Sequence, residues 1–489
     1  MKEENDKNLI FKIIEWGVYL LVFLLPWQAR MIYKTGELAG GFWEYGTFAL
    51  YGTEILLLIL VVLNLIVWIK KTKEQKSKKT NMFNKLFSCF LVFLFMVACL
   101  TIFWAQDSWL VLFKFVTLLE GFMFFWLIIS ARVKFRKLAW AIVLSGLAQA
   151  GLGIWQFLGQ EIVGNKWLGM ATQIPMDGGV SVVGTVLRRW LRAYGSLPHP
   201  NILGGWLVVG LVLCVGLYED AYRRLRVMWS EERNMKREKR KRDGFLILNI
   251  VILLCCYIVT LFGLLCTFSR GAWVAMTIAI LLYCFIAFFG KYKIRRVVAV
   301  KLLIVGLLIV AVFGFTFSEP FLARVTGEGR LENKSIEERI NGYKEAREIL
   351  DQNWLGGVGL GNYTLYMYNR DVEQKNTGSF DSSLHSSLRI STLFRDYQPV
   401  HNLWLLVWAE LGVFGLLFFA AITLSIINYQ LSIIRKIKDN SWTLISLMTL
   451  LTVIILSFFD HYFWSLYFGV MVWWMVLGLT FILRYDNME

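Results

Sequence analysis

Apolar residues dominate the chain in runs of about 20, and shorter polar stretches separate these runs. A helix needs about 20 apolar residues to cross roughly 30 Å of hydrocarbon, because each residue adds about 1.5 Å. The pattern therefore predicts an all-α, polytopic integral membrane protein. About twelve spans are expected, at 9–29, 47–69, 86–106, 109–130, 138–158, 201–218, 245–266, 271–289, 297–317, 401–427, 441–459 and 463–483.

The composition supports this class. Of the 489 residues, 57% are hydrophobic and 18% are charged, against about 45–50% apolar and about 25% charged residues in soluble domains. An ordinary soluble enzyme is therefore excluded. The net charge of +16 does not indicate nucleic acid as a partner, because the basic residues lie in loops between apolar runs, where they set orientation in the bilayer.

The basic residues are unevenly distributed among these loops. Lys and Arg are densest in segments 70–79 and 223–242, which fall on the same side of the membrane in this topology. Because basic loops stay in the cytoplasm, both termini are predicted to be cytoplasmic. Segments 159–200 and 318–400 then face the outside, and we expect the chemistry there.

Three regions follow from this topology, namely residues 1–317 with the first nine spans, the outer loop 318–400, and residues 401–489 with the last three spans. In the loop, Ser335-Ile-Glu-Glu338 is a capping box followed by apolar residues at helical spacing. We expect an amphipathic helix over about 335–351 that lies on the membrane face. The glycines of 356–363 are typical of a turn, because a phosphate loop would need G-x-G-x-x-G spacing or a Walker lysine.

Two arginines are expected at the outer boundary of the membrane, where a charge is costly unless it is paired or faces water. Arg192 precedes the sixth span, and Arg270 lies in the tight turn between the seventh and eighth. Guanidinium groups stay ionised and bind phosphate oxygens through paired hydrogen bonds, so both could hold a phosphate or pyrophosphate. The alternative is that each extends to the lipid headgroups, and Arg188 and Arg189 compete with Arg192 for the role.

His401 begins the tenth span at the same depth. A neutral imidazole at a helix N-terminus can take a proton from an alcohol, so His401 is a candidate base. The alternative is a histidine that caps its own helix. Glu410, about 13 Å further along that helix, would support rather than catalyse.

The other histidines have plainer interpretations. His199, between two prolines, is expected to be a turn residue, whereas His385 and His461 are expected to be solvated. Four scattered histidines without an acidic or cysteine cluster show no metal-ligand spacing, so no metal site is predicted.

Four motifs occur in a specific order. They are R-x-x-G-x-x-x-H-P-N from Arg192 to Asn201, S-R-G-A from Ser269 to Ala272, NWLGGVGLGNY at 353–363, and H-N-x-x-L followed by E-L-G from His401 to Gly412. Their order over about 190–430 resembles the bacterial O-antigen ligase and O-antigen polymerase family.

The resemblance implies a GT-C-like membrane glycosyltransferase that is metal-independent and inverting. Such enzymes move a glycan from an undecaprenyl-pyrophosphate carrier to a hydroxyl of lipid A core, a growing polysaccharide or a protein, at the outer face of the cytoplasmic membrane. Arg192 and Arg270 would then hold the pyrophosphate and His401 would activate the acceptor, with no cofactor. Arg188, Arg189 and Arg339 are additional candidates for anion contacts.

Two questions stay open at this level. The motifs do not distinguish a ligase from a polymerase or a protein-glycosylating member, because these differ in their acceptor. A transporter or flippase that moves lipid-linked glycans without bond formation is the alternative function. A transporter would show charges along a path through the membrane and related halves, whereas here the candidate residues gather at one face.

Overall fold

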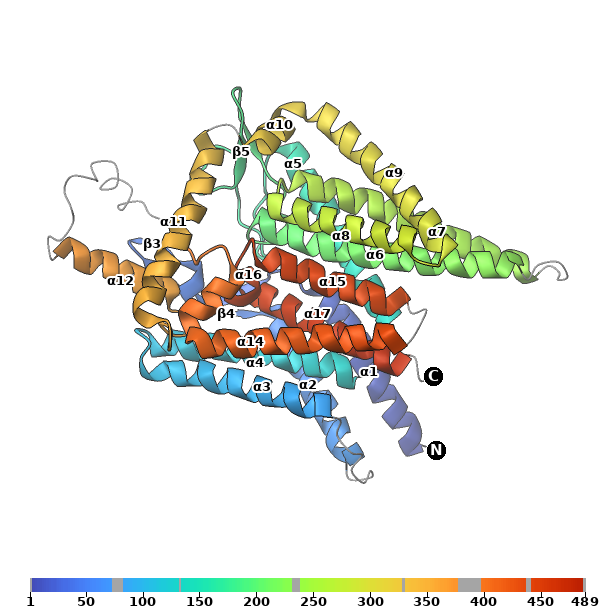
Figure 1. The fold of residues 1–489 in the computed structure, drawn as a ribbon, viewed down its shortest axis with the longest axis horizontal. Helices are drawn as coiled ribbons and strands as arrows, with labels where there is room; N and C mark the ends of the chain where they lie inside the picture. Colours follow the sequence, from blue (N-terminus) through green and yellow to red (C-terminus); the bar gives the residue numbers. More distant parts are fainter. Residues whose placement is uncertain are drawn as a thin grey trace.

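The computed structural model describes residues 2–72, 82–131, 133–230, 238–327, 330–376, 397–436 and 441–486. The chain is mostly helical, and its long helices run side by side in one bundle (Figure 1). The helices are α1 (Lys2–Leu24), α2 (Gly52–Thr72), α3 (Met82–Leu100), α4 (Ser108–Ser130), α5 (Phe135–Gly159), α6 (Pro200–Ser230), α7 (Glu238–Cys266), α8 (Arg270–Phe289), α9 (Lys293–Thr316), α10 (Ser318–Thr326), α11 (Arg330–Asn353), α12 (Tyr363–Asn376), α14 (Leu403–Lys436), α15 (Ser441–Ser457), α16 (Tyr462–Ser465) and α17 (Tyr467–Asp486), with short 3-10 turns η1 (Glu44–Gly46) and η2 (Thr101–Phe103).

The all-α membrane class is confirmed. Among the described residues, nine helices are long and apolar enough to cross a bilayer, and α15 and α17 are shorter apolar helices. Each of the expected spans falls on one of these eleven helices or on α1, whose first half is charged. The number of spans that cross the membrane, and the side that the termini face, stay predictions.

Helix α6 forms the centre of the bundle. In its most apolar 18-residue stretch, 94% of the residues are buried, against 22% in Gly52–Ile69 of α2. Helices α5, α7, α8, α9 and α15 surround it, and glycines allow close approach: a Cβ at Gly204 would lie 2.8 Å from the Cβ of Ala272. A helix that is apolar on every side is stable only inside such a bundle, whereas the outer helices present apolar residues to lipid.

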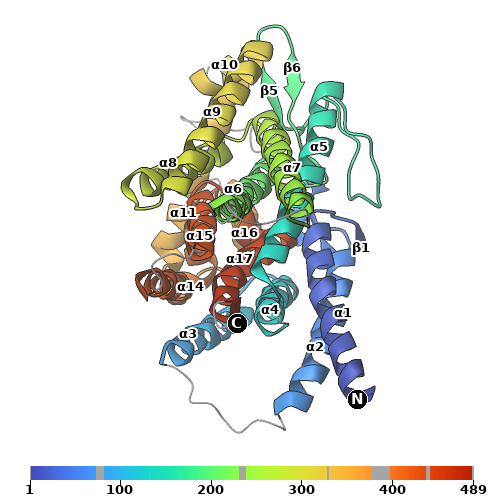
Figure 2. The same ribbon diagram turned by 90° about the vertical axis from the view of Figure 1, so that its right-hand side faces the viewer.

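Both termini lie at one end of the bundle, which we call the termini end. Segments 159–200, 318–327, 330–376 and 397–402 lie at the other, the loop end (Figures 1 and 2). Helix α11 crosses the loop end at a steep angle to the bundle (Figure 1). It begins at Arg330, so Ser335 lies within the helix rather than at its start. Ile336, Ile340 and Tyr343 are exposed, which leaves this apolar face available to a membrane surface.

Three small antiparallel sheets at the loop end were not expected from the pattern. Strands β1 (Arg30–Lys34) and β4 (Phe48–Tyr51) pair with Arg30 opposite Tyr51, and β2 (Glu37–Leu38) pairs with β3 (Gly41–Phe42). Strands β5 (Val182–Gly184) and β6 (Arg189–Leu191) form the hairpin that leads into Arg192. Such short strands show too few alternating positions for the pattern to reveal them.

Helix α14 is broken inside the bundle at Gly412, whose φ is 71°. The break frees backbone groups that the glycine segment 356–363 satisfies, because the amides of Val358 and Gly359 donate to the carbonyls of Ala409 and Glu410. A Cβ at Gly412 would lie 1.9 Å from the Leu355 carbonyl oxygen, so no larger residue fits.

The predicted glycine turn is confirmed by the same contact. Gly357, Gly359 and Gly361 all have positive φ values, of 70°, 103° and 74°. Residues other than glycine rarely adopt such values. The motifs 353–363 and His401–Gly412 are therefore two halves of one packing contact.

Candidate active site

Three helices begin close together at the loop end. Helix α6 starts at Pro200, α8 at Arg270 and α14 at Leu403, and the turn after α15 touches all three starts. In this turn, Phe459 lies 3.0 Å from the position that a Cβ on Gly271 would take, and Asp460 contacts residues just before α14 and at the start of α6. Helix N-termini carry partial positive charge, so their convergence favours an anion.

Arg192 is 5% exposed and is held by three hydrogen bonds. Its Nε donates to the carbonyl oxygen of Thr267, while its two terminal nitrogens donate to Ser181 Oγ and Asn201 Oδ1, each bond being 2.7 Å long. The guanidinium therefore has a fixed orientation between the β5–β6 hairpin, the turn before α8 and the start of α6.

Asn201 connects this arginine to a carboxylate. Its side-chain amide donates to Asp460 Oδ2 at 3.1 Å, and the other oxygen of Asp460 lies 3.7 Å from His401 Nδ1. Asp460 is 8% exposed. Burial opposes its ionisation, but His401, His461 and His199 hold the pKa of Asp460 well below its ordinary value. The carboxylate therefore stays charged beside the imidazole.

His401 does not cap its own helix. Asn402 does so, by accepting the backbone N–H of Leu405 at 3.0 Å. His401 Nδ1 is buried without a hydrogen-bond partner among the described residues and faces Asp460. Catalytic hydrogen bonds in unliganded sites are often long and tighten when substrate binds.

The prediction that His461 is solvated is wrong. It is 3% exposed, and its Nδ1 lies 2.7 Å from Ser465 Oγ while its Nε2 lies 3.9 Å from Asp460. Burial lowers the pKa of His461 to about 3. Its place in a short turn suggested exposure, but the turn is covered by Tyr45, whose ring centre lies 5.5 Å away.

The two remaining histidines are His199 and His385. His199 Nδ1 accepts the backbone N–H of Asn201 at 3.1 Å, as expected of a turn residue. Burial, with Arg192 nearby, lowers the pKa of His199 to about 3. His385 lies outside the described residues.

Arg270 is the first residue of α8, whose N-cap is Ser269. Its guanidinium extends toward the outer loop, where Nη1 lies 4.0 Å from the position that a Cβ on Gly327 would take. The turn before it has strained backbone at Phe268, with φ of 47°. Arg192 thus bonds to the turn that precedes Arg270, while the Arg270 guanidinium lies near Gly327 of the outer loop.

Arg324 is an arginine that the motifs did not reveal. It lies on α10, is 5% exposed, and its Nε donates to the Phe268 carbonyl oxygen at 2.7 Å. Together with Arg192 and Arg270 it makes the turn 267–270 strongly cationic. The sequence contains no motif that connects Arg324 to this turn, because α10 contacts the turn only in the folded chain.

The additional anion candidates lie elsewhere in the loops. Arg188 stacks on the Trp190 ring, with its guanidinium carbon 3.6 Å from the ring centre. Arg189 donates to the carbonyl oxygens of Met176 and Asp177, and Arg339 lies on α11. None of these contacts involves Arg192 or Arg270.

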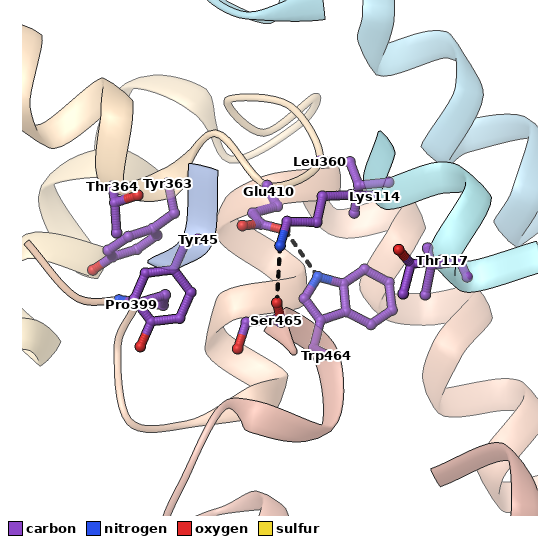
Figure 3. Close-up of a pocket in the computed structure, with 12 residues that line it drawn as sticks. Tyr45, Lys114, Thr117, Leu360, Tyr363, Thr364, Pro399, Glu410, Trp464 and Ser465 are labelled. Carbon is purple, nitrogen blue, oxygen red and sulfur yellow. Dashed lines mark hydrogen bonds between the residues drawn. The ribbon is translucent and has the colours of Figure 1, made fainter. Parts of the chain in front are cut away.

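Glu410 is buried, and its Oε2 accepts the indole N–H of Trp464 at 2.8 Å (Figure 3). Lys114 of α4 shares this pocket and donates to the Ser465 carbonyl oxygen at 3.0 Å. Because Ser465 also contacts His461, the Glu410 pocket adjoins the histidine cluster. The expected supporting place of Glu410 beside the site stays a prediction.

One group in the described part of the chain has the size of a metal site. Ligand atoms of His401, Asp460 and His461 all lie within 4.8 Å of one another. Sequence spacing could not reveal this group, because His401 precedes α14 whereas Asp460 and His461 follow α15. The same three side chains also suit proton transfer, which needs no ion.

Residues 255–420 match the family model described as O-Antigen ligase. This match supports the O-antigen ligase family, and we call the matched residues 255–420 the O-antigen ligase domain. No curated protein matches the chain. The O-antigen ligase domain includes Arg270, His401 and Glu410, whereas Arg192 and Asp460 lie outside the matched residues and join the site through the fold. At a coarse level, the match and the apolar helices support a membrane-embedded ligase of the glycosyltransferase type.

Proposed function

We propose that the protein transfers a glycan from an undecaprenyl-pyrophosphate carrier to an acceptor hydroxyl at the outer face of the cytoplasmic membrane. The observation that carries the proposal is the continuous contact from Arg192 through Asn201 and Asp460 to His401. In this path, two side chains connect a guanidinium suited to phosphate with an imidazole suited to proton transfer. Transfer to an alcohol from a pyrophosphate needs these two groups at one place.

The base in this proposal is His401. With Nδ1 protonated and turned to Asp460, its Nε2 takes the proton of the acceptor hydroxyl. The acceptor oxygen then bonds to the anomeric carbon as the bond from that carbon to the pyrophosphate oxygen breaks. Attack opposite the leaving group inverts the anomeric centre. Asp460 stabilises the imidazolium that forms and fixes its tautomer, a role that supports His401 without touching substrate.

The second half of the step is the departure of the leaving group. Undecaprenyl pyrophosphate departs with additional negative charge, which Arg192, Arg270 and the N-terminus of α8 stabilise in this proposal. Because the donor is already activated, this chemistry requires no nucleotide. Three hydrogen bonds orient Arg192 before substrate binds, so little reorganisation of this group is needed during transfer.

The first test measures binding of undecaprenyl pyrophosphate to the full-length protein by native mass spectrometry. We expect Arg192→Lys and Arg270→Lys to weaken binding at least tenfold, because lysine cannot make paired contacts with phosphate oxygens. Arg188→Lys is the matched control and should bind as the wild type does. Equal binding by all four proteins would contradict the pyrophosphate site.

A second test follows the product. The purified protein is incubated in liposomes with lipid-linked glycan extracted from host cells that lack the gene, and with the unmodified acceptor of the same cells. Mass analysis of the product then distinguishes a ligase, a polymerase and a protein-glycosylating enzyme. Movement of intact lipid-linked glycan across the liposome membrane without any product would instead favour a transporter.

A further inference from the structure

The pocket around Lys114 and Glu410 has no assigned role in the transfer step. It is lined by residues of α4, α12, α14, α16 and adjoining loops, as Figure 3 shows. A carboxyl group and an ammonium group face the same small space, together with the ring of Tyr45. The space admits about one water-sized group, so it fits a hydroxyl rather than a complete sugar ring.

Thr364, on the same wall, has an unused hydroxyl. The residue is 2% exposed, and its Oγ1 is buried without a hydrogen-bond partner among the described residues. A buried polar atom without a partner destabilises the fold. Such an atom in the wall of a polar pocket indicates that a ligand atom or a water supplies its missing hydrogen bond.

The pocket also adjoins the reacting groups. Ser465 lines it and contacts His461 Nδ1 at 2.7 Å, and Pro399 lines it two residues before His401. The polar contacts therefore run from Arg192 through Asn201, Asp460 and His461 to Ser465 and Lys114. Arg192 and Lys114 lie at opposite ends of this path, with the histidines between them.

We propose that this pocket binds a hydroxyl group of the acceptor sugar, next to the hydroxyl that His401 activates. The inference rests on the proposed function, because it names the acceptor side of that same site. Lys114 donates to the hydroxyl, and Glu410 accepts from it or donates to it, which matches a group that is both donor and acceptor. Thr364 completes the hydrogen bonds, while the sugar ring lies outside the pocket mouth.

The charges favour a sugar hydroxyl over the phosphate of a lipid. A phosphate would meet the carboxyl group of Glu410, whereas the cationic turn 267–270 offers arginines and a helix N-terminus. In this proposal the donor binds at the Arg192 end of the contact path and the acceptor at the Lys114 end. This arrangement suits attack on the anomeric carbon from the face opposite the leaving group.

Thr364→Val tests the proposal, because valine keeps the shape and removes the hydroxyl. The full-length protein is assayed in liposomes with saturating lipid-linked glycan extracted from host cells that lack the gene, and with increasing amounts of their unmodified acceptor. We expect the half-saturating amount of acceptor to rise three- to tenfold, the size of one lost hydrogen bond. Binding of undecaprenyl pyrophosphate should not change.

Thr452→Val is the matched control, since Thr452 is equally buried but bonds within its own helix, to the Met448 carbonyl oxygen. It should leave acceptor saturation unchanged. Lys114→Met, which removes a second donor, is expected to raise the half-saturating amount at least as much as Thr364→Val.

Two results would overturn the proposal in distinguishable ways. If Thr364→Val and Lys114→Met transfer glycan with unchanged acceptor saturation, the pocket is not an acceptor site while the enzyme function stands. If the wild-type protein binds undecaprenyl pyrophosphate but forms no product with the host acceptor, the proposed function fails and the acceptor site fails with it.

Discussion

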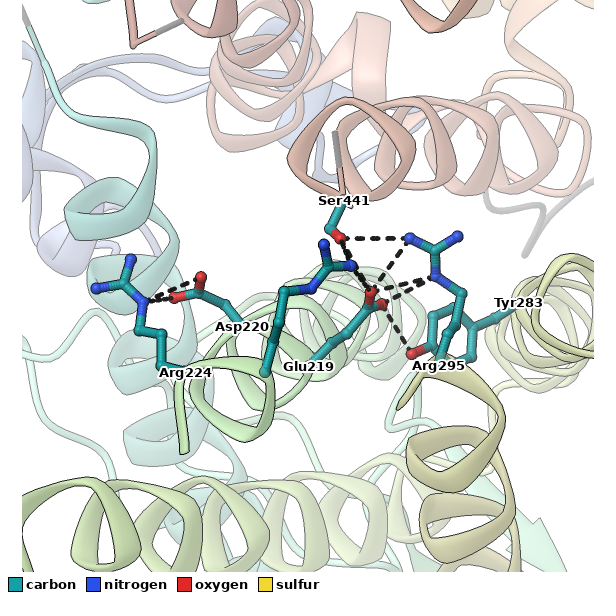
Figure 4. A network of polar contacts seen from close by, with 7 residues as sticks. Glu219, Asp220, Arg224, Tyr283, Arg295 and Ser441 are labelled. Atoms are coloured by element: carbon teal, nitrogen blue, oxygen red, sulfur yellow. Dashed lines mark hydrogen bonds and ion pairs between the residues drawn. The ribbon is translucent and has the colours of Figure 1, made fainter. Parts of the chain in front are cut away.

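The two ends of α6 hold two different kinds of polar cluster. At the termini end, Glu219 is fully buried and accepts hydrogen bonds from Arg295, Tyr283 and Ser441, which belong to α9, α8 and α15 (Figure 4). Arg223 adds an ion pair at 3.0 Å. Every oxygen of this carboxylate has partners, so the cluster has the features of a structural connection.

The loop end differs because some of its buried polar atoms have no hydrogen-bond partner among the described residues. His401 Nδ1 and Thr364 Oγ1 are both buried without hydrogen-bond partners in the described part of the chain. Leaving such atoms unpaired costs stability, and a site that binds substrate recovers the cost only when the substrate arrives. The comparison teaches that burial and charge mark both clusters. Among the described residues, buried atoms without hydrogen-bond partners occur at His401 and Thr364 but not at Glu219 or the side chains that bond to it.

The largest expected effect is on transfer. His401→Ala should lower the rate of glycan transfer at least 100-fold, because a general base contributes about 10²–10⁴. The melting temperature should stay within about 2 °C, since the His401 Nδ1 has no hydrogen-bond partner among the described residues and the side chain is 23% exposed. Initial rates and thermal unfolding of the same preparation measure both quantities. A fully active His401→Ala protein would exclude the base assignment.

The second prediction concerns the structural cluster. Glu219→Gln should destabilise the protein by about 3–5 kcal/mol, because Arg295, 6% exposed, loses its charged partner. Transfer per folded molecule should remain within threefold of the wild type. Denaturant unfolding in detergent, followed by fluorescence, measures the change.

Asp220→Asn is the control for this effect. Asp220 pairs with Arg224 and Arg136, whose side chains are 50% and 36% exposed, and exposed pairs contribute about 0–1 kcal/mol. Equal destabilisation by the two variants would contradict the structural assignment of the Glu219 cluster.

The third prediction uses pH to test the burial of His461 at the loop end. The pKa of His461 is about 3 in the folded protein, below its ordinary value of about 6.5. The unfolded chain therefore binds more protons between these values, so stability must fall as pH decreases from about 6.5 toward 3. Between pH 7 and pH 5 the loss from this residue should be about 1–2 kcal/mol.

The measurement is thermal unfolding of the wild type and of His461→Gln at both pH values. The variant should lose less stability on acidification, because glutamine does not titrate. Identical pH dependence of the two proteins would show that His461 is not buried as a neutral imidazole.

The smallest expected effect is at the rim of the loop end. Arg188→Gln should change the transfer rate less than twofold, because Arg188 stacks on Trp190 and contacts neither Arg192 nor Asn201. A tenfold loss in the transfer assay would place Arg188 in the anion site and enlarge the cationic turn described above.

The membrane architecture could be predicted from the sequence, because the length of an apolar run is a local property set by the thickness of the bilayer. The motif residues Arg192, Arg270 and His401 could also be identified, since each lies at the end of an apolar run where a charge is costly. The glycine turn at 356–363 was recognisable because glycine alone adopts positive φ without strain.

The partners of these residues could not be predicted in this way. Asp460 and His461 follow a different helix and are adjacent to His401 only through the packing of α15 against α6 and α14. Arg324 and Thr364 reach their places through the outer loop.

The sequence by itself determined the protein's class, its candidate phosphate ligands and its candidate base, because these depend on residue type and on the local position in an apolar run. Only the tertiary structure decided which side chains meet at one point, which polar atoms lack partners, and that α14 breaks where the glycine segment packs. Contacts between distant segments depend on how whole helices pack, and no local pattern records that packing.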